Sequence, residues 1–125
     1  MKETISTPRA PAAIGPYSQA TKYNGLIFVS GQLPLEPTTG QLHTGSISEQ
    51  TVLAMNNVKR IVEAAGSSLD NILKTTILLA DMKDFAAVNE AYGQFFPSDP
   101  PARVAYQVAA LPKGAQIEIE VICAQ

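Results

Sequence analysis

The sequence is poor in the residues that form disulfides and metal sites. It contains one cysteine, Cys123, and one histidine, His43. A single cysteine cannot form a disulfide within the chain, and a thiol or imidazole metal site needs more ligands than these two. We therefore expect no metal site and a reducing, intracellular setting. Cys123 is predicted to be packed and unreactive. His43 has no acidic partner in an assignable triad and is predicted to lie in an exposed loop.

Positive charge is scarce as well. The chain has nine scattered Lys and Arg residues and eleven Asp and Glu residues, which gives a net charge of −2. Such a chain offers no basic stripe for a phosphate backbone, so nucleic acid is not expected as its main partner. The first 25 residues contain three prolines and no long apolar run. They give no sign of a signal peptide or a membrane span, and we expect a cytoplasmic protein.

Several enzyme motifs are absent, namely G-x-G-x-x-G, the Walker lysine motif, H-E-x-x-H and C-x-x-C. Nucleotide-binding, zinc-protease and thioredoxin-like functions therefore lack their required parts, and any chemistry must use side chains and water. The 125 residues fit one domain, 1–125, because a chain of this length buries roughly two thirds of its unfolded surface around a single core.

Alternation and turn residues predict six strands and two helices in the order β-β-β-α-β-α-β-β. The strands are expected around Ile5 and over 17–23, 26–30, 72–80, 102–110 and 115–124. The spacing of Ser46 and Glu49 predicts a capping box for a first helix over about 46–65. Asp84 is expected to cap a second helix, whose apolar stripe runs to Phe96 before Pro97 ends it.

This order predicts an α+β fold, a mixed sheet with two helices packed on it. Segments 26–30 and 77–80 are apolar on both faces, yet two helices can cover only one face of a sheet. We expect the other face to pack against another subunit in a closed, symmetric oligomer. The alternative is that loops cover it.

Arg103 is one of only three arginines and follows a proline-rich loop. Strand alternation places it on one face with Ala105, so that a small side chain leaves room beside the guanidinium. A guanidinium holds a carboxylate through two parallel hydrogen bonds, which makes a small acid a suitable ligand. The alternative is a salt bridge with an internal carboxylate.

Glu118 and Glu120 lie in the stretch QIEIEVI, and a period of two places both on one face of a strand. One of these carboxylates could act as general base and then general acid, especially if partial burial raises its pKa. The spacing does not select between them, and a polar outer face of an edge strand is the alternative. Tyr17, Ser30, Gly31 and Asn89 are weak signals when each is considered alone.

Four segments together resemble the RidA (YjgF) family along essentially the whole chain: APAAIGPYSQA, FVSGQLPL, NVKRIVEAAG and PARVAYQVAALPKGAQIEIEVI. The resemblance implies a chorismate-mutase-like fold, a homotrimer with active sites between subunits, and no cofactor. It implies the hydrolysis of 2-imino acids to 2-keto acids and ammonia. A non-catalytic protein that binds small carboxylates on the same trimer is the alternative, and an endoribonuclease is a further one.

The resemblance also implies roles for individual residues. Arg103 matches the arginine that binds the substrate carboxylate, and Glu118 matches the glutamate that positions water. The other positions that match residues lining the same pocket are Tyr17, Ser30, Gly31 and Asn89. At Ala105 some relatives have a cysteine, but this position is expected to contribute its backbone amide. Glu120 is expected to be a structural or surface residue.

Overall fold

A computed structural model describes residues 1–125. The chain forms the six strands and two helices expected, in the expected order. They are β1 (Glu3–Ile5), β2 (Ala20–Tyr23), β3 (Leu26–Gln32), α1 (Ile47–Ala64), β4 (Ile72–Leu79), α2 (Phe85–Gly93), β5 (Ala102–Gln107) and β6 (Ile117–Ala124). None of the helices combines the length and the apolar composition needed to cross a lipid bilayer.

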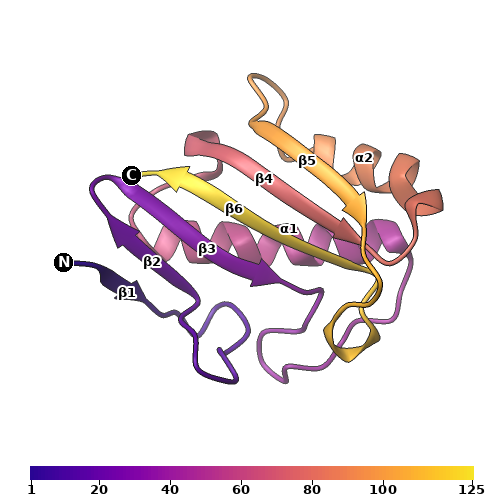
Figure 1. Cartoon of the computed structure of the whole chain (residues 1–125), viewed down its shortest axis with the longest axis horizontal. Coiled ribbons are helices and arrows are strands. Elements are labelled where there is room, and N and C mark those ends of the chain that lie inside the picture. The colour runs from indigo at the N-terminus through magenta and orange to yellow at the C-terminus, as the bar shows by residue number, and fades with distance from the viewer.

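All six strands belong to one sheet, in the order β1-β2-β3-β6-β4-β5. The last strand of the chain lies at its centre, antiparallel to β3 and to β4, as Figure 1 shows. β5 pairs with β4 in parallel and forms one edge of the sheet. The sheet is therefore mixed, as predicted.

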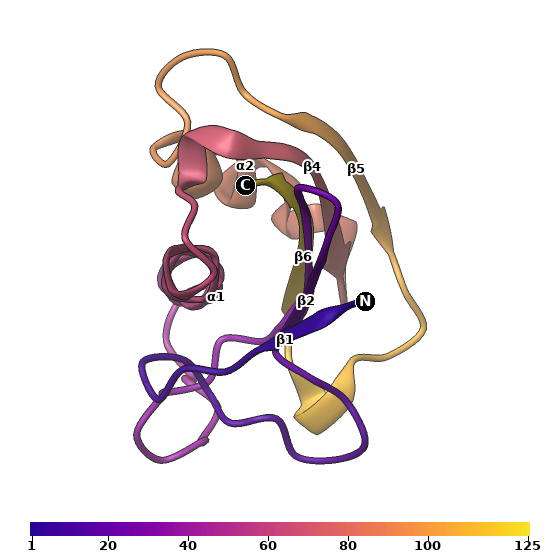
Figure 2. The same ribbon diagram turned by 90° about the vertical axis from the view of Figure 1, so that its left-hand side faces the viewer.

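Both helices pack on the same face of the sheet (Figure 2). Residues at the centre of this face are fully buried, including Ile27, Ile77 and Ile119, each with 0% exposure. On the opposite face, large apolar side chains remain exposed. Phe28, Val104 and Tyr106 keep 44%, 42% and 49% of their surface. The loops of the chain therefore leave this second face open, which excludes the alternative that they cover it.

The first helix begins as its sequence predicts. Ser46 occupies the N-cap position in an extended conformation, and its hydroxyl accepts a hydrogen bond from the Glu49 amide at 3.1 Å. The Glu49 side chain does not return to the Ser46 amide, as a full capping box requires, but contacts His43 instead. One half of the predicted box is therefore formed.

The second helix differs from its prediction at both ends. Asp84 stands at the N-cap but makes no side-chain cap bond. The short 3₁₀ turn that precedes the helix, Met82–Asp84, is capped by Asp81, whose carboxylate accepts from the Lys83 amide at 2.9 Å. The helix ends at Gly93, four residues before Pro97.

Two strands, β2 and β5, are each three residues shorter than predicted. β2 begins at Ala20 because the buried side chain of Gln19 holds the preceding segment as a loop. The Gln19 amide oxygen accepts from the Thr7 amide at 2.7 Å, and its nitrogen donates to the Pro11 carbonyl at 2.8 Å. β5 ends at Gln107, whose side chain accepts from the Met82 amide at 2.9 Å.

Replacing the N-cap tests this account of α1. Ser46→Ala should lower the free energy of unfolding by about 0.5–2 kcal/mol, because the Glu49 amide loses its acceptor. Urea denaturation measures the change. Ser48→Ala in the first turn of the same helix is the control and should change stability by only a few tenths of a kcal/mol. Equal losses in both variants would contradict the capping role.

Candidate functional site

Gly31 and Glu118 come together on the open face, where β3 and β6 are neighbours. The register between these strands shifts between Val29 and Gln32, and Gly31 lies in this irregular stretch. A Cβ atom added to Gly31 would lie 2.8 Å from the carboxyl carbon of Glu118 and closer still to one of its oxygens. Glycine leaves room for the carboxylate where it lies, and a larger residue would force the end of the Glu118 side chain to move.

Glu118 faces a hollow of about 620 Å³ on the side of the sheet away from the helices. Tyr17, Ser30 and Gly31 also line this hollow, so that four of the predicted site residues share one surface. The loop is held in place at Ser30, whose hydroxyl donates to the Ser18 carbonyl at 2.6 Å and whose amide donates to the Gln19 carbonyl at 2.9 Å.

The Glu118 carboxyl is half-buried, and burial raises its pKa above the ordinary value. The like charge of Glu120, two residues further along the same strand, raises this pKa in addition. Glu120 is exposed but also lines the hollow. The structure therefore separates the two carboxylates by burial, which the spacing in the sequence could not do. A carboxylate with a raised pKa is a stronger base than an ordinary glutamate.

Arg103 and Asn89 form a second group at the edge strand β5. The Arg103 guanidinium donates to the Asn89 side-chain oxygen at 2.7 Å and lies over the rings of Phe85 and Tyr92, at 5.4 and 5.2 Å from their centroids. None of the ion pairs in the structure involves Arg103. The alternative of an internal salt bridge is therefore wrong, and the guanidinium is held in place without a carboxylate partner.

The two groups lie on opposite faces of the sheet. Arg103 is paired with Thr75, which is buried against α2 through a 2.8 Å hydrogen bond to Tyr92. Glu118 is paired with Leu78 on the other face. Ala105, paired with the buried Ile77, lies on the Arg103 side and packs against the core. A single chain therefore does not bring Arg103 and Glu118 together.

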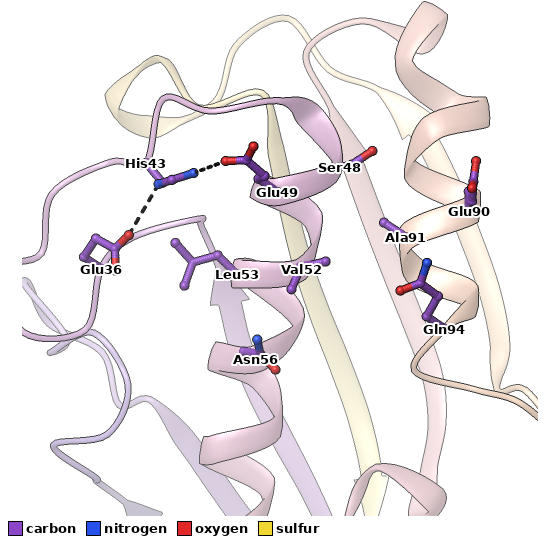
Figure 3. Close-up of a pocket in the computed structure, with 10 residues that line it drawn as sticks. All are labelled: Glu36, His43, Ser48, Glu49, Val52, Leu53, Asn56, Glu90, Ala91 and Gln94. Carbon is purple, nitrogen blue, oxygen red and sulfur yellow. Dashed lines mark hydrogen bonds and ion pairs between the residues drawn. The ribbon is translucent and has the colours of Figure 1, made fainter.

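His43 lies in a loop, as predicted, but it is partly buried and has acidic partners, which the prediction excluded. Its ring nitrogens contact Glu49 at 2.9 Å and Glu36 at 3.4 Å. Figure 3 shows these contacts at one end of a groove of about 550 Å³ between α1 and α2. They connect the loop after β3 to the start of α1. The groove contains none of the predicted site residues.

The hollow beside Glu118 also contains residues that the sequence analysis did not select. Its apolar wall includes Ile14, Leu33 and Leu35, and Lys113 lies among the polar residues. The apolar residues belong to irregular segments, whose path no periodic pattern predicts. Lys113 follows Pro112 and precedes Gly114 in the connection between β5 and β6.

The protein is a small α+β protein with a six-stranded mixed sheet and both helices on one face. Its candidate site is the carboxylate-lined hollow on the open face. The family model described as Endoribonuclease L-PSP matches residues 7–125. The chain belongs to this family, and the predicted RidA-type family assignment is confirmed.

Relatives match all or nearly all of the chain. Human 2-iminobutanoate/2-iminopropanoate deaminase is 51% identical over 125 residues, covering 100% of this chain and 91% of the human protein. Reactive Intermediate Deaminase A, chloroplastic, of Arabidopsis thaliana is 52% identical over 121 residues, covering 97% of this chain and 65% of the plant protein.

Solved structures match the fold. The crystal structure of RidA from an Antarctic Psychrobacter has a TM-score of 0.94 and 45% identity, covering 98% of this chain and 99% of that one. Escherichia coli TdcF with bound serine has a TM-score of 0.94 and 44% identity, with 98% of each chain covered.

The contacts of His43 predict a measurable rise in its pKa. The hydrogen bond with Glu49 is the largest cause that raises the pKa of His43, and Glu36 adds to it. Because the folded-state pKa is raised, the stability from these contacts is fully present below the unfolded pKa and is lost as pH rises through the folded pKa.

The chain has a single histidine, so an NMR titration reports this group alone. The pKa of His43 should lie above that of an unfolded reference peptide, and Glu49→Gln should lower it more than Glu36→Gln. A pKa at or below the peptide value would show that the contacts do not form in solution.

Proposed function

We propose that this protein hydrolyses 2-imino acids, such as 2-iminopropanoate and 2-iminobutanoate, to 2-keto acids and ammonia. The observation that carries this function is the 51% identity, over all 125 residues, with mammalian enzymes named as deaminases of these two compounds. The chemistry of the hollow agrees with it, because a half-buried carboxylate beside an open surface can activate water.

Arg103 binds the carboxylate of the substrate in this proposal. Its guanidinium has no carboxylate partner within the chain, and Asn89 and two aromatic rings restrict its position. A restricted guanidinium loses little side-chain freedom when it binds a carboxylate, which favours bidentate binding. The C=N carbon next to that carboxylate is then fixed relative to Arg103.

Glu118 activates the water. The ionised carboxylate accepts a proton as water attacks the carbon of the protonated imine, and a C–O bond forms while the C=N π electrons move to nitrogen. Glu118 then returns the proton to nitrogen. The C–N bond breaks as an oxygen lone pair forms the C=O bond of the 2-keto acid, and the hydroxyl proton passes to the Glu118 carboxylate and from there to the departing ammonia, which leaves as ammonium. No cofactor enters this scheme, because a protonated imine is already an electrophile.

The remaining residues shape the pocket. Gly31 gives the Glu118 carboxylate its space. Tyr17, whose hydroxyl lies 3.4 Å from the Ile14 amide, forms a wall of the hollow together with Ser30. Ala105 contributes its backbone amide beside the bound substrate.

The active form is a homotrimer of the chorismate-mutase-like type, with a site between each pair of subunits. Two features support this assembly. Arg103 and Glu118 lie on opposite faces of one sheet, so that a complete site needs residues of two chains. The open face also exposes large apolar side chains, including Phe28, Val104 and Tyr106, that an interface would cover.

RNA cleavage is not favoured, although the family description names an endoribonuclease. The net charge is −2, and the hollow is lined by two glutamates that would repel a phosphate backbone. We propose a cytoplasmic location. The Arabidopsis relative is named as chloroplastic.

A charged side chain introduced on the open face tests the proposed subunit interface. Tyr106→Glu places a carboxylate where the subunits would pack, and it should convert trimers to monomers at micromolar concentration and abolish turnover. Analytical ultracentrifugation measures the mass. Tyr106→Phe keeps the aromatic ring and should remain trimeric. A trimer that survives Tyr106→Glu would place the interface elsewhere.

The shared site is tested by mixing two inactive variants. The assay couples a threonine dehydratase to semicarbazide trapping of the imine, so that hydrolysis lowers the trapped product. Arg103→Ala should cost about 2–5 kcal/mol of transition-state stabilisation, through loss of the carboxylate contact. Glu118→Gln should lower kcat by about 10²–10⁴-fold, because the general base is lost.

Refolding the two variants together should restore activity at about one site in four, because random assembly combines an intact Arg103 of one chain with an intact Glu118 of its neighbour. Mixing Arg103→Ala with the Arg103→Ala/Glu118→Gln double variant is the control and should restore nothing. Absence of recovery in the first mixture would mean that each chain forms its own site.

A further inference from the structure

The hollow beside Glu118 poses an electrostatic problem for an anionic substrate. Glu118 and Glu120 both line it, and both point from the same face of β6. A 2-imino acid carries a carboxylate, which these two groups repel. Arg103 lies on the opposite face of the sheet, so within one chain it does not offset this repulsion. Lys113 is the only lysine or arginine that lines the hollow.

The charge of Lys113 is not used elsewhere in the chain. None of the ion pairs includes Lys113, and its ammonium group has one long contact, 3.4 Å, with the Gly40 carbonyl. A carbonyl oxygen accepts a hydrogen bond but does not neutralise the ammonium. The positive charge therefore remains available at the edge of the hollow.

The backbone at Lys113 has an unusual conformation. Lys113 has φ of 60° and ψ of 15°, a left-handed conformation that lysine rarely adopts, within the 3₁₀ turn Pro112–Gly114. Gly or Asn would adopt this conformation with less strain. The turn thus keeps a long cationic side chain at a position where a small residue would be easier to accommodate.

We infer that Lys113 is a substrate-recruiting residue, which attracts the carboxylate of the incoming anion to the hollow before Arg103 of the neighbouring chain binds it. This role rests on the proposed function. An exposed cation acts through the field around it and not through one fixed hydrogen bond, so Lys113 should affect substrate capture more than the chemical step.

The experiment compares four variants with the native protein in the imine-trapping assay at low and high salt. Lys113→Gln removes the charge, and Lys113→Asn removes it while suiting the left-handed turn. Lys113→Arg keeps the charge. Lys59→Gln is the matched control, because Lys59 is exposed on α1, makes no ion pair, and its loss changes the net charge equally.

Lys113→Gln and Lys113→Asn should both raise KM by roughly three- to tenfold at low ionic strength and leave kcat within about twofold. The salt dependence of kcat/KM should be weaker in both than in the native protein. Lys113→Arg and Lys59→Gln should match the native protein. If Lys113→Gln had the KM and the salt dependence of the native protein, the inference would be overturned. It would also be overturned if KM rose in Lys113→Gln but stayed native in Lys113→Asn, because the rise in KM would then come from the conformation of the turn and not from the lost charge.

Titration of the native trimer and the same variants with 2-ketobutyrate separates this inference from the proposed function. The dissociation constant of this small 2-keto acid should rise by roughly three- to tenfold in Lys113→Gln and not in Lys59→Gln. If binding of 2-ketobutyrate depended on Lys113 but the native protein did not hydrolyse imine, the proposed hydrolysis would be wrong and the role of Lys113 in attracting the anion would stand. An affinity independent of Lys113 would overturn that role.

Discussion

Both helices of this protein pack against the same face of its sheet, and the other face is left without cover. The central strands β3, β6 and β4 bury one row of side chains against α1 and α2, with Ile27, Ile77 and Ile119 fully enclosed. The alternate residues of the same strands point the other way. Glu118 belongs to that second row, whereas Arg103, on the edge strand β5, points toward α2 on the helix side of the sheet. A single chain therefore does not bring these two groups together, because the helices occupy only one face of the sheet.

Much of the fold follows from local patterns. The Ser46 cap and the period-two alternation of the final strand each predict their element correctly, because neighbouring residues determine them. The site residues are different. From residue types alone, Arg103 and Glu118 each have a structural alternative, a salt bridge for the arginine and a polar strand face for the glutamate, and only the resemblance to a family supplies the functional interpretation.

The features that sequence reasoning missed depend on contacts between distant segments. The length of β2 is limited by Gln19, whose side chain binds a loop about ten residues earlier. His43 acquires two acidic neighbours because the loop after β3 folds back against α1. The burial that separates Glu118 from Glu120 likewise depends on the packing of a whole surface and not on spacing along one strand.

The close approach of Gly31 and Glu118 has a consequence for protein engineering. Any side chain added at position 31 displaces the carboxylate that faces it across two neighbouring strands. A library that varies position 31 alone would therefore contain mostly misplaced glutamates and would underestimate what the pocket can accept. A larger residue at position 31 is compatible only with a rotated Glu118 or with a shorter acid at position 118, so a library that varies both positions samples arrangements that a library at position 31 alone omits.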